Sequence, residues 1–450
     1  MLSNQIGALL SQAALTAKIT NDAAEITTLS ALIITPKKQI KALGIDGFVE
    51  LADFVNARCD TIQISVRLQP GVYFDDIVPY RDDLTIQLYV DSGSTVKQRD
   101  FVAVPLIDRD VRSESNNTAD NNMDAQNFIA MIPYKFQLID KGFAKLKNIQ
   151  VSNIYQMSNP ADVLATIMKE ETEKVGLESW DAFKNVYMHQ PVDNTNKYRQ
   201  IIIPSGTRLV DVPTLIQNHN EYGVYSKGLG CYYKQHYWWI YPLYNTFIVD
   251  QHKRPLDIIR VPQNKIPDLK STFYKSDVGM TIIAAGGSKH TDGADVRKQN
   301  QGTGQRLVMG DAISGDTGYH YNNGRAITTR ADSMQEYTLS ERRDGEDFVP
   351  LNPNPTGNVC AALTENAKNE GEIIQVEWRN GDIGYLEPGH PLRYQYMEDD
   401  EQMKVRTGVL LGYRCDYKPI TTNPEPAMKR TTILYIFLKK AAKYKNEQTA

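Results

Sequence analysis

Apolar and polar residues alternate along two long regions of the chain, and this period of two predicts β-strands. In the first region TIQISVRL begins at Thr61 and LTIQLYV follows, with a turn at Gly71 between them. The second contains GEIIQVEWRNGDIGYLEPGHPLRYQYM, KVRTGVLLGYRCDYKPI and RTTILYIFLKK. Successive strands without a long helix between them are typical of antiparallel barrels or sandwiches. We therefore predict a β-barrel domain at 25–157 and a second barrel region at 256–450.

Between these regions the apolar spacing becomes helical. In SNPADVLATIMKEETEKVGL, Ser158 or Asn159 can cap a helix, Pro160 suits its first turn, and Gly176 can end it. The next segment, SWDAFKNVYM, predicts a second short helix. We assign residues 158–255 to a small middle domain that combines helices with a strand-helix-strand unit.

The strand-helix-strand unit lies in residues 203–244, a stretch that ends in a dense run of aromatic residues. Asp211 is expected to cap its helix, and two strands are expected to meet near Lys227–Gly228. Adjacent residues of a strand point to opposite faces, so Trp238 and Trp239 cannot both contact one ligand. We expect one of them in the core and the other against a neighbouring domain or subunit.

The N-terminal segment 1–24 predicts an amphipathic helix or arm. Its apolar positions Leu2, Ile6, Leu9 and Leu10 follow helical spacing. The segment lacks a basic start and is interrupted by serine and glutamine, which does not fit a signal peptide. The apolar face is expected either to pack on its own chain or to dock on a neighbouring protein.

Two polar segments interrupt the second barrel region. Residues 284–333 are rich in glycine, aspartate, asparagine and threonine. A structureless loop of this length is uncommon inside a compact domain, so we expect it to be disordered alone, functional, or ordered by a partner. Further along, four consecutive carboxylates separate two predicted strands. They are Glu398, Asp399, Asp400 and Glu401.

Composition narrows the functional classes. The length of 450 residues and the hydrophobic share of 41% predict two to four domains with real cores. A formal net charge of -4 argues against a general nucleic-acid binder. The chain contains no run approaching about 20 apolar residues, so no membrane span is expected.

The sequence lacks the common motifs of metal-binding, dinucleotide-binding and hydrolase sites. The four cysteines form no CxxC pair, and Gly302-Thr-Gly304 lacks the third glycine of a dinucleotide fingerprint. The sequence contains no GxSxG or HExxH motif. Glu170–Glu171 and the 398–401 carboxylates could serve glycoside hydrolysis, although solvated faces are the commoner explanation. We predict no catalytic, cofactor-binding or metal site, no cofactor and no enzyme activity.

The order of these parts resembles the baseplate hub proteins of contractile-tailed phages, and their relatives in tail-associated lysins and phage-like secretion machines. The P-x-G-T turn of that family is similar to Pro204–Thr207, and its YGV-like helix exit is similar to Tyr222–Val224. A PG turn and a later TGV strand resemble Pro388–Gly389 and Thr407–Val409.

The resemblance implies a mostly β, α+β protein whose two tube-like barrels come together in a homotrimer, forming a ring of six similar barrels. Such a ring adapts a six-fold tail tube to a three-fold spike. The implied partners are a trimeric spike protein, a tail tube or tube-initiator protein, and baseplate wedge proteins. The implied location is the virion, with assembly in the host cytoplasm.

Carboxylates on the wall of such a ring would repel DNA, which passes through the channel without specific binding. We therefore expect residues 398–401 to face the channel, and we expect Leu2, Ile6, Leu9, Leu10, Trp238 and Trp239 to serve partner or subunit interfaces. Three other functions stay open: a six-fold distal tail or tube-initiator protein, a tail-associated cell-wall hydrolase, and a glycan-binding protein.

Overall fold

The structure is a computed structural model. It describes residues 27–69, 71–91, 96–106, 132–177, 182–191, 194–250, 252–261, 273–275, 279–285, 289–290, 307–309, 319–322, 325–328, 335–337, 347–349, 358, 360, 363–364, 367–368, 371–379, 381, 383–397, 403–420 and 427–439.

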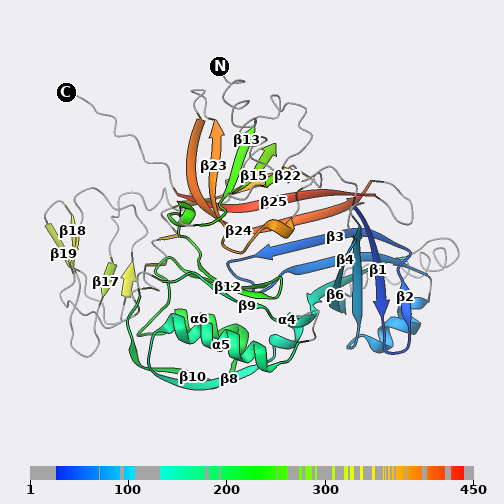
Figure 1. Ribbon diagram of the computed structural model, residues 1–450, viewed down its shortest axis with the longest axis horizontal. Coiled ribbons are helices and arrows are strands. Elements are labelled where there is room, and N and C mark those ends of the chain that lie inside the picture. The colour runs from blue at the N-terminus through cyan, green and yellow to red at the C-terminus, as the bar shows by residue number, and fades with distance from the viewer. Residues whose placement is uncertain are drawn as a thin grey trace, which may run out of the picture.

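One fifteen-stranded sheet dominates the described fold (Figure 1). Its N-terminal strands are β1 (Thr27–Ile34), β2 (Gln39–Lys41), β3 (Gly44–Asp53), β4 (Thr61–Leu68), β5 (Thr85–Asp91), β6 (Val96–Pro105) and β7 (Ile132–Asp140). Its C-terminal strands are β13 (Leu256–Val261), β14 (Phe273–Lys275), β15 (Met280–Ala285), β16 (Lys289–His290), β22 (Gly371–Arg379), β23 (Pro391–Met397), β24 (Met403–Pro419) and β25 (Ala427–Lys439). The prediction of a mostly β fold is confirmed.

Eight of these strands close into a ring. The antiparallel pairings run β24-β3-β4-β7-β6-β5-β1-β25, and β25 pairs back with β24. The strict burial alternation of β1, BiBiBiBi, places Leu29, Ala31 and Ile33 inside the ring. We call this set of strands the eight-stranded ring. Six of its strands come from residues 27–140 and two from the C-terminal region, so the N-terminal strands do not close on themselves.

The strands β24 and β25 extend beyond the ring into a second group of strands. The first part of β24 pairs with β23 through Met403–Val409, and its second part pairs with β3 through Gly412–Tyr417. The register of β24 against β25 shifts between Leu410 and Gly412, which marks the change from one group to the other. The strand β25 likewise continues onto β22, and β13 and β15 add parallel pairs next to β23. The large sheet therefore combines strands of 25–157 with strands of 256–450, while the division of these regions into two tube-like barrels stays a prediction.

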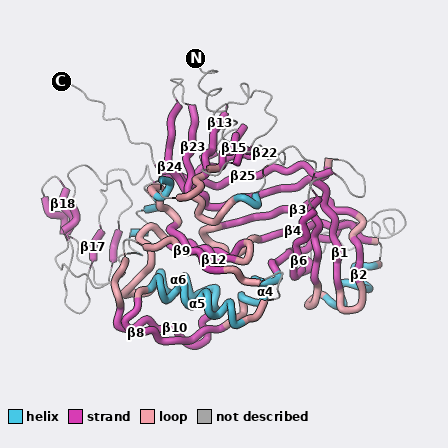
Figure 2. Tube along the Cα trace, in the orientation of Figure 1, coloured by secondary structure: helices cyan, strands magenta, loops and turns pink. Residues whose placement is uncertain are grey.

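The middle unit covers the ring on one side (Figures 1 and 2). Two small sheets, β8-β10 and β9-β12-β11, enclose the helices α5 and α6 between them. The elements are α4 (Lys141–Leu146), β8 (Gln150–Ser158), α5 (Pro160–Lys174), β9 (Asn185–Met188), β10 (Tyr198–Arg208), α6 (Val212–Gln217), β11 (Leu229–Lys234) and β12 (Tyr237–Pro242), with short helices η4 (Leu209–Asp211) and η5 (Ile248–Asp250). Most of their apolar side chains form a core separate from that of the large sheet, whereas Tyr232 and Tyr241 belong to the core of the large sheet.

The remaining described elements are short. The helices η2 (Tyr73–Ile77) and η3 (Val78–Tyr80) connect β4 to β5, and η7 (Ile383–Tyr385) precedes β23. Five strands between residues 307 and 349 pair only with one another among the described residues. They are β17 (Leu307–Met309), β18 (Tyr319–Asn322), β19 (Arg325–Thr328), β20 (Gln335–Tyr337) and β21 (Asp347–Val349). No helix in the described part of the chain has the length and apolar character needed to cross a membrane.

The helix signals in the middle unit are confirmed with two corrections. The Asn159 side chain accepts from the Ala161 amide at the start of α5, and Gly176 follows its end with φ +61°. Asp211 precedes α6, but its carboxylate pairs with Arg208 at 2.7 Å and caps nothing. The prediction of a second helix in SWDAFKNVYM is wrong over Asn185–Met188, because these residues form a strand that pairs in parallel with β12. Pairing with the rest of the sheet outweighs local helix propensity there.

The predicted turn of the aromatic hairpin is also wrong. The strands β11 and β12 meet at Gln235 and His236, with φ of 54° and 69°, and not near Lys227–Gly228. Two-residue hairpin turns of this kind favour asparagine or glycine, so the sequence gives no turn signal at a glutamine-histidine pair. Because Tyr233 pairs with Trp238 and Lys234 pairs with Tyr237, Gln235 and His236 are left as the two turn residues. Gly228 instead leads into β11 with φ +79°.

Candidate functional site

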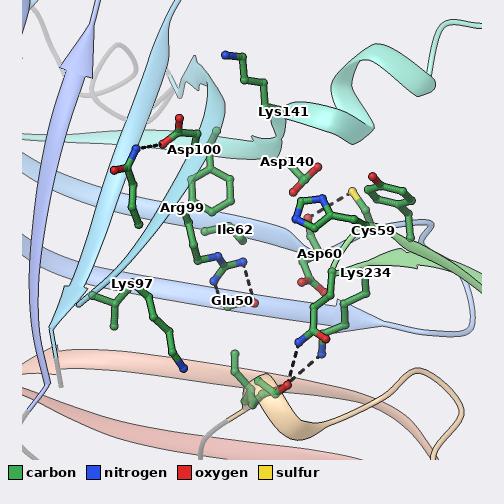
Figure 3. A pocket seen from close by; sticks show the side chains of 18 of the residues that line it. Glu50, Cys59, Asp60, Ile62, Lys97, Arg99, Asp100, Asp140, Lys141 and Lys234 are labelled. Atoms are coloured by element: carbon green, nitrogen blue, oxygen red, sulfur yellow. Dashed lines mark hydrogen bonds and ion pairs between the residues drawn. The ribbon is translucent and has the colours of Figure 1, made fainter. Parts of the chain in front are cut away.

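A polar cavity of about 1060 Å³ lies at one end of the eight-stranded ring, next to the β11–β12 hairpin (Figure 3). Side chains from the ring, from the hairpin and from η7 line it together. The ring contributes Glu50, Arg99 and Tyr413, and the segment before β4 contributes Asp60. Three separate parts of the chain thus meet around buried charges.

Strand alternation aims Glu50 and Arg99 into the ring. Glu50 lies on β3 between the buried Phe48 and Ala52, and Arg99 precedes the buried Phe101 by two positions on β6. Arg99 Nη1 donates to Glu50 Oε2 at 2.8 Å, and Nη2 lies 3.4 Å from Oε1. Burial opposes ionisation of Glu50, but Arg99 outweighs it and holds the pKa of Glu50 below its usual range. The pair is therefore charged at neutral pH.

Asp60 is the second carboxylate of the cavity. The Tyr232 hydroxyl on β11 donates to Asp60 Oδ1 at 2.8 Å. Burial raises the pKa of Asp60 to about 6, and Glu50 adds to the rise while Lys234 and Arg99 oppose it. This carboxyl group therefore changes its charge in the mildly acidic range.

Lys234 ends β11 and reaches across all three parts of the junction. Its Nζ donates to the Leu386 carbonyl at 2.7 Å, just after η7. The ammonium also lies 4.6 Å from the centre of the Tyr413 ring and 5.8 Å from that of Phe54. Burial lowers the pKa of Lys234, whereas Asp60 and Glu50 favour its charged form.

The segment that joins β3 to β4 is held by the middle unit. Arg58 donates to the Val210 carbonyl at 3.1 Å, to the Cys231 carbonyl at 3.2 Å and to Thr214 Oγ1 at 2.6 Å. The Tyr241 hydroxyl donates to the Phe54 carbonyl at 3.0 Å. These bonds fix the middle unit on the end of the ring, so the site is a structural junction.

The two tryptophans of the hairpin occupy opposite faces. Trp238 is fully buried in the middle core, where its Nε1 donates to Thr172 Oγ1 at 2.9 Å. Trp239 is partly buried, packs against the core of the large sheet and stacks on Tyr187 with ring centres 4.8 Å apart. In the isolated chain only Trp239 therefore offers surface to a partner, and the assignment of the pair to a partner interface stays a prediction.

The cavity has limited scope for catalysis. The Cys59 thiol on its wall has a pKa raised by burial, which disfavours the nucleophilic thiolate. Glu50 and Asp60 are engaged by Arg99 and Tyr232. In the part of the chain that the structure describes, no three His, Cys, Asp or Glu residues are arranged to hold a metal ion. The arrangement can join two units and respond to protons.

The remaining predicted site residues lie outside the part of the chain that the structure describes. Leu2, Ile6, Leu9 and Leu10 lie outside the described residues, as do Glu398, Asp399, Asp400 and Glu401. Most of residues 284–333 lies outside them too. Sequence reasoning missed the buried charges. Charged residues at apolar positions of strand patterns were the available signal, as in FVELAD and GCYYK.

Residues 65–275, just under half of the chain, match the family model described as Bacteriophage PBS1 gene 109 protein. This segment is similar to a phage protein family. The resemblance to phage proteins that the sequence indicates is thereby confirmed, and the match includes the whole middle unit, the ring strands β5, β6 and β7, and part of β4. No curated protein sequence matches the chain significantly.

Solved structures with a loose likeness are tail proteins and their relatives. A tail protein from Neisseria meningitidis MC58 is 10% identical with a TM-score of 0.43, and 92% of this chain and 96% of that chain are covered. The 43 kDa tail protein of prophage MuSo2 from Shewanella oneidensis is 9% identical with a TM-score of 0.42, covering 90% and 98%. A type VI secretion component from E. coli, whose description notes similarity to T4 tail proteins gp27 and gp5, is 9% identical with a TM-score of 0.37, covering 92% and 78%. Likeness at this level transfers no role to the chain.

Proposed function

We propose that this chain is a structural protein of a phage tail and acts as a baseplate hub. In this proposal three copies form a ring in which each chain supplies two tube-like β-barrel regions. The ring of six similar units adapts a six-fold tail tube to a three-fold spike. The match of residues 65–275 to a phage family supports the proposal.

The observation that carries the proposal is the sharing of β24 and β25 between the two strand groups. Both strands run without interruption from the eight-stranded ring into the C-terminal group, pairing with β3 and β1 in one and with β23 and β22 in the other. Backbone hydrogen bonds therefore fix the two groups relative to each other, with no flexible linker. A rigid pair of β units per chain suits a ring that must keep pseudo-six-fold spacing with three subunits.

The polar contacts of the junction support a structural role over an enzymatic one. Arg58, Tyr241 and Lys234 each use their polar groups to join the ring, the middle unit and η7. Such networks specify one relative arrangement of parts, and breaking one partner of a buried pair is costly. A protein that transmits mechanical load through a tail tip needs this kind of fixed junction.

The remaining assignments follow from the same proposal. The partners are a tail tube or tube-initiator protein, a trimeric spike and baseplate wedge proteins, and the location is the virion after assembly in the host cytoplasm. The carboxylates Glu398, Asp399, Asp400 and Glu401 face the channel and repel DNA. Leu2, Ile6, Leu9 and Leu10 dock on a neighbouring tail protein. A map of the assembled ring with residues 398–401 on its outer rim would refute the channel assignment.

Inactivating the reading frame in the phage or prophage that carries it tests the structural role. Electron micrographs of the resulting lysate should show heads without complete tails, because a hub is needed before a tube can be built. Supplying the wild-type chain in trans should restore complete tails. Normal tails made without the chain would contradict the proposal.

One observation favours a second function, a cell-wall hydrolase. Asp60 has a pKa raised to about 6 and lies beside Glu50 in a cavity, a combination that occurs in acid-base catalysis. Purified chain should then release soluble fragments from peptidoglycan, and the Asp60→Asn variant should lose this activity while still supporting tail assembly. Under the structural proposal neither protein releases fragments.

A further inference from the structure

The tip of the β11–β12 hairpin lines the cavity at the end of the ring (Figure 3). Its residues are Lys234, Gln235 and His236, which we call the hairpin tip. Lys234 Nζ donates to the Leu386 carbonyl at 2.7 Å, and Gln235 Nε2 donates to the Gly384 carbonyl at 2.8 Å. The tip is thus bonded to the η7 region on one side and lies over the charges of the ring on the other.

Backbone bonds hold the base of the tip against the ring. The Tyr233 amide donates to the Arg58 carbonyl at 2.7 Å, and the Tyr232 hydroxyl donates to Asp60 Oδ1 at 2.8 Å. Withdrawal of the hairpin would break both bonds. Asp60 would then lose its cover and be hydrated, while Glu50 and Arg99 would keep their own pair inside the ring.

Ionisable groups face the tip from every element packed around it. The ring contributes Glu50, Arg99 and Tyr413, and the segment before β4 contributes Asp60. The segment after η7 contributes Glu387 and His390, the middle unit contributes Tyr232 and Lys184, and Asp140 lies at the end of β7. Cys59 adjoins Asp60. Because acidic and basic groups both surround the tip, the net charge around it depends on whether Asp60 is ionised.

We propose that the hairpin tip is a proton-controlled latch, which stays in place against the ring and the η7 region while Asp60 is protonated and loosens when Asp60 ionises. The closed state buries Asp60 and so disfavours its charge, whereas the open state hydrates it. A carboxyl group whose pKa is raised in the closed state stabilises that state below its usual pKa, and this stabilisation is lost as the pH rises through the closed-state value. For Asp60 the window runs from 3.8 to about 6.

Other ionisable groups favour the closed state as the pH rises. The pH dependence of opening in the wild type alone therefore does not isolate the effect of Asp60. Burial lowers the pKa of His236, and it lowers that of His390 to about 4. Both histidines therefore loosen the closed state as the pH falls. Glu50 keeps its pair with Arg99 in both states, so this pair does not change the pH dependence of closure. Comparison with Asp60→Asn removes these shared contributions, because the variant keeps all three groups.

Hydrogen exchange of the full chain tests the latch. The amide exchange rates of peptides from residues 229–242 are measured at pH 5 and pH 7.5, and each rate is divided by the intrinsic rate at that pH. Peptides from β4 serve as an internal control for global unfolding. With closed and open pKa values of about 6 and 3.8, the ratio of wild-type to Asp60→Asn opening should rise about tenfold between the two pH values. An unchanged ratio would overturn the proposal.

Two further variants sharpen the result. Asp100→Asn changes a carboxylate on the rim of the same cavity that accepts hydrogen bonds from Gln98 and Gln87. Its ratio to wild type should stay constant with pH, and a tenfold rise there would overturn the role of Asp60. Lys234→Met removes a cation that favours ionised Asp60, so the pH at which the hairpin loosens should move upward. A midpoint that does not move upward would also contradict the latch.

Discussion

Gly412 of β24 and Ala52 of β3 lie backbone against backbone at the point where the two strand groups join. A Cβ atom on Gly412 would lie 2.2 Å from the Ala52 carbonyl oxygen, closer than any real contact. The contact coincides with the register shift between Leu410 and Gly412, where β24 leaves β23 and begins to pair with β3. The fusion of the two groups therefore depends on a residue without a side chain.

Gly412→Ala should destabilise the chain strongly, because the clashing atom is backbone that cannot rotate away. We expect a loss of more than about 2 kcal/mol in the free energy of unfolding, measured by urea denaturation. Gly47→Ala is the matched control, since a Cβ at Gly47 on β3 would meet its nearest atom, the Tyr417 carbonyl oxygen, at 4.0 Å. Equal stability of the two variants would contradict the description of this seam.

Glu50→Gln should weaken the ring by leaving Arg99 without its charged partner. The Glu50 side chain is 3% exposed and that of Arg99 is 37% exposed, so water screens part of the loss. We expect about 2 kcal/mol, below the range for a fully buried pair. Asp416→Asn breaks the more exposed pair with Arg414 and should cost less than about 1 kcal/mol in the same urea titration. A smaller loss for Glu50→Gln than for Asp416→Asn would count against a supporting role of the buried pair.

Trp238→Phe should destabilise the middle unit more than Trp239→Phe. The change at Trp238 removes buried ring volume and the bond to Thr172 Oγ1, whereas Trp239 is only partly buried and donates to the Lys234 carbonyl at 3.3 Å. We expect about 2–3 kcal/mol for the first and about 1 kcal/mol for the second. Thermal unfolding followed by circular dichroism would compare them, and the reverse order would contradict the assignment of the two faces.

His390 should contribute to loss of stability in acid. Its Nε2 donates to the Arg254 carbonyl at 2.7 Å, and burial lowers the pKa of the ring to about 4 from 6.5. The folded state therefore favours neutral His390, so its contribution is fully present above pH 6.5 and is lost as the pH falls toward 4. Over that window the unfolding free energy of the wild type should fall by about 3 kcal/mol relative to His390→Asn. Urea titrations between pH 4 and 8 measure this difference, and His219→Asn should leave the wild-type slope unchanged.

Strand periodicity predicted the fold class well, because alternation reports directly which face of a strand is buried. TIQISVRL became β4 with the pattern iBeBiBiB. The helix cap at Asn159 and the helix end at Gly176 could be predicted equally well, since both depend on neighbours within one helix turn.

Long-range relationships were beyond such local signals. Nothing near β1 indicates that the ring is completed by β25, which lies about 400 residues further along the chain. The charged cluster of Glu50, Asp60, Arg99 and Lys234 likewise combines residues from distant segments. A charged residue in a strand pattern can be recognised as unusual, but its partner is fixed only by the pairing of the strands.

The mass of the purified assembly tests the central claim most directly. One chain has a mass of 50.8 kDa, so native mass spectrometry of a trimer should give three times this value, and class averages of the same sample should show a three-fold ring with six similar lobes. A six-chain ring would contradict the hub proposal and favour a distal tail or tube-initiator protein. A chain that stays monomeric even after addition of purified tail tube and spike proteins would contradict a ring-forming role altogether.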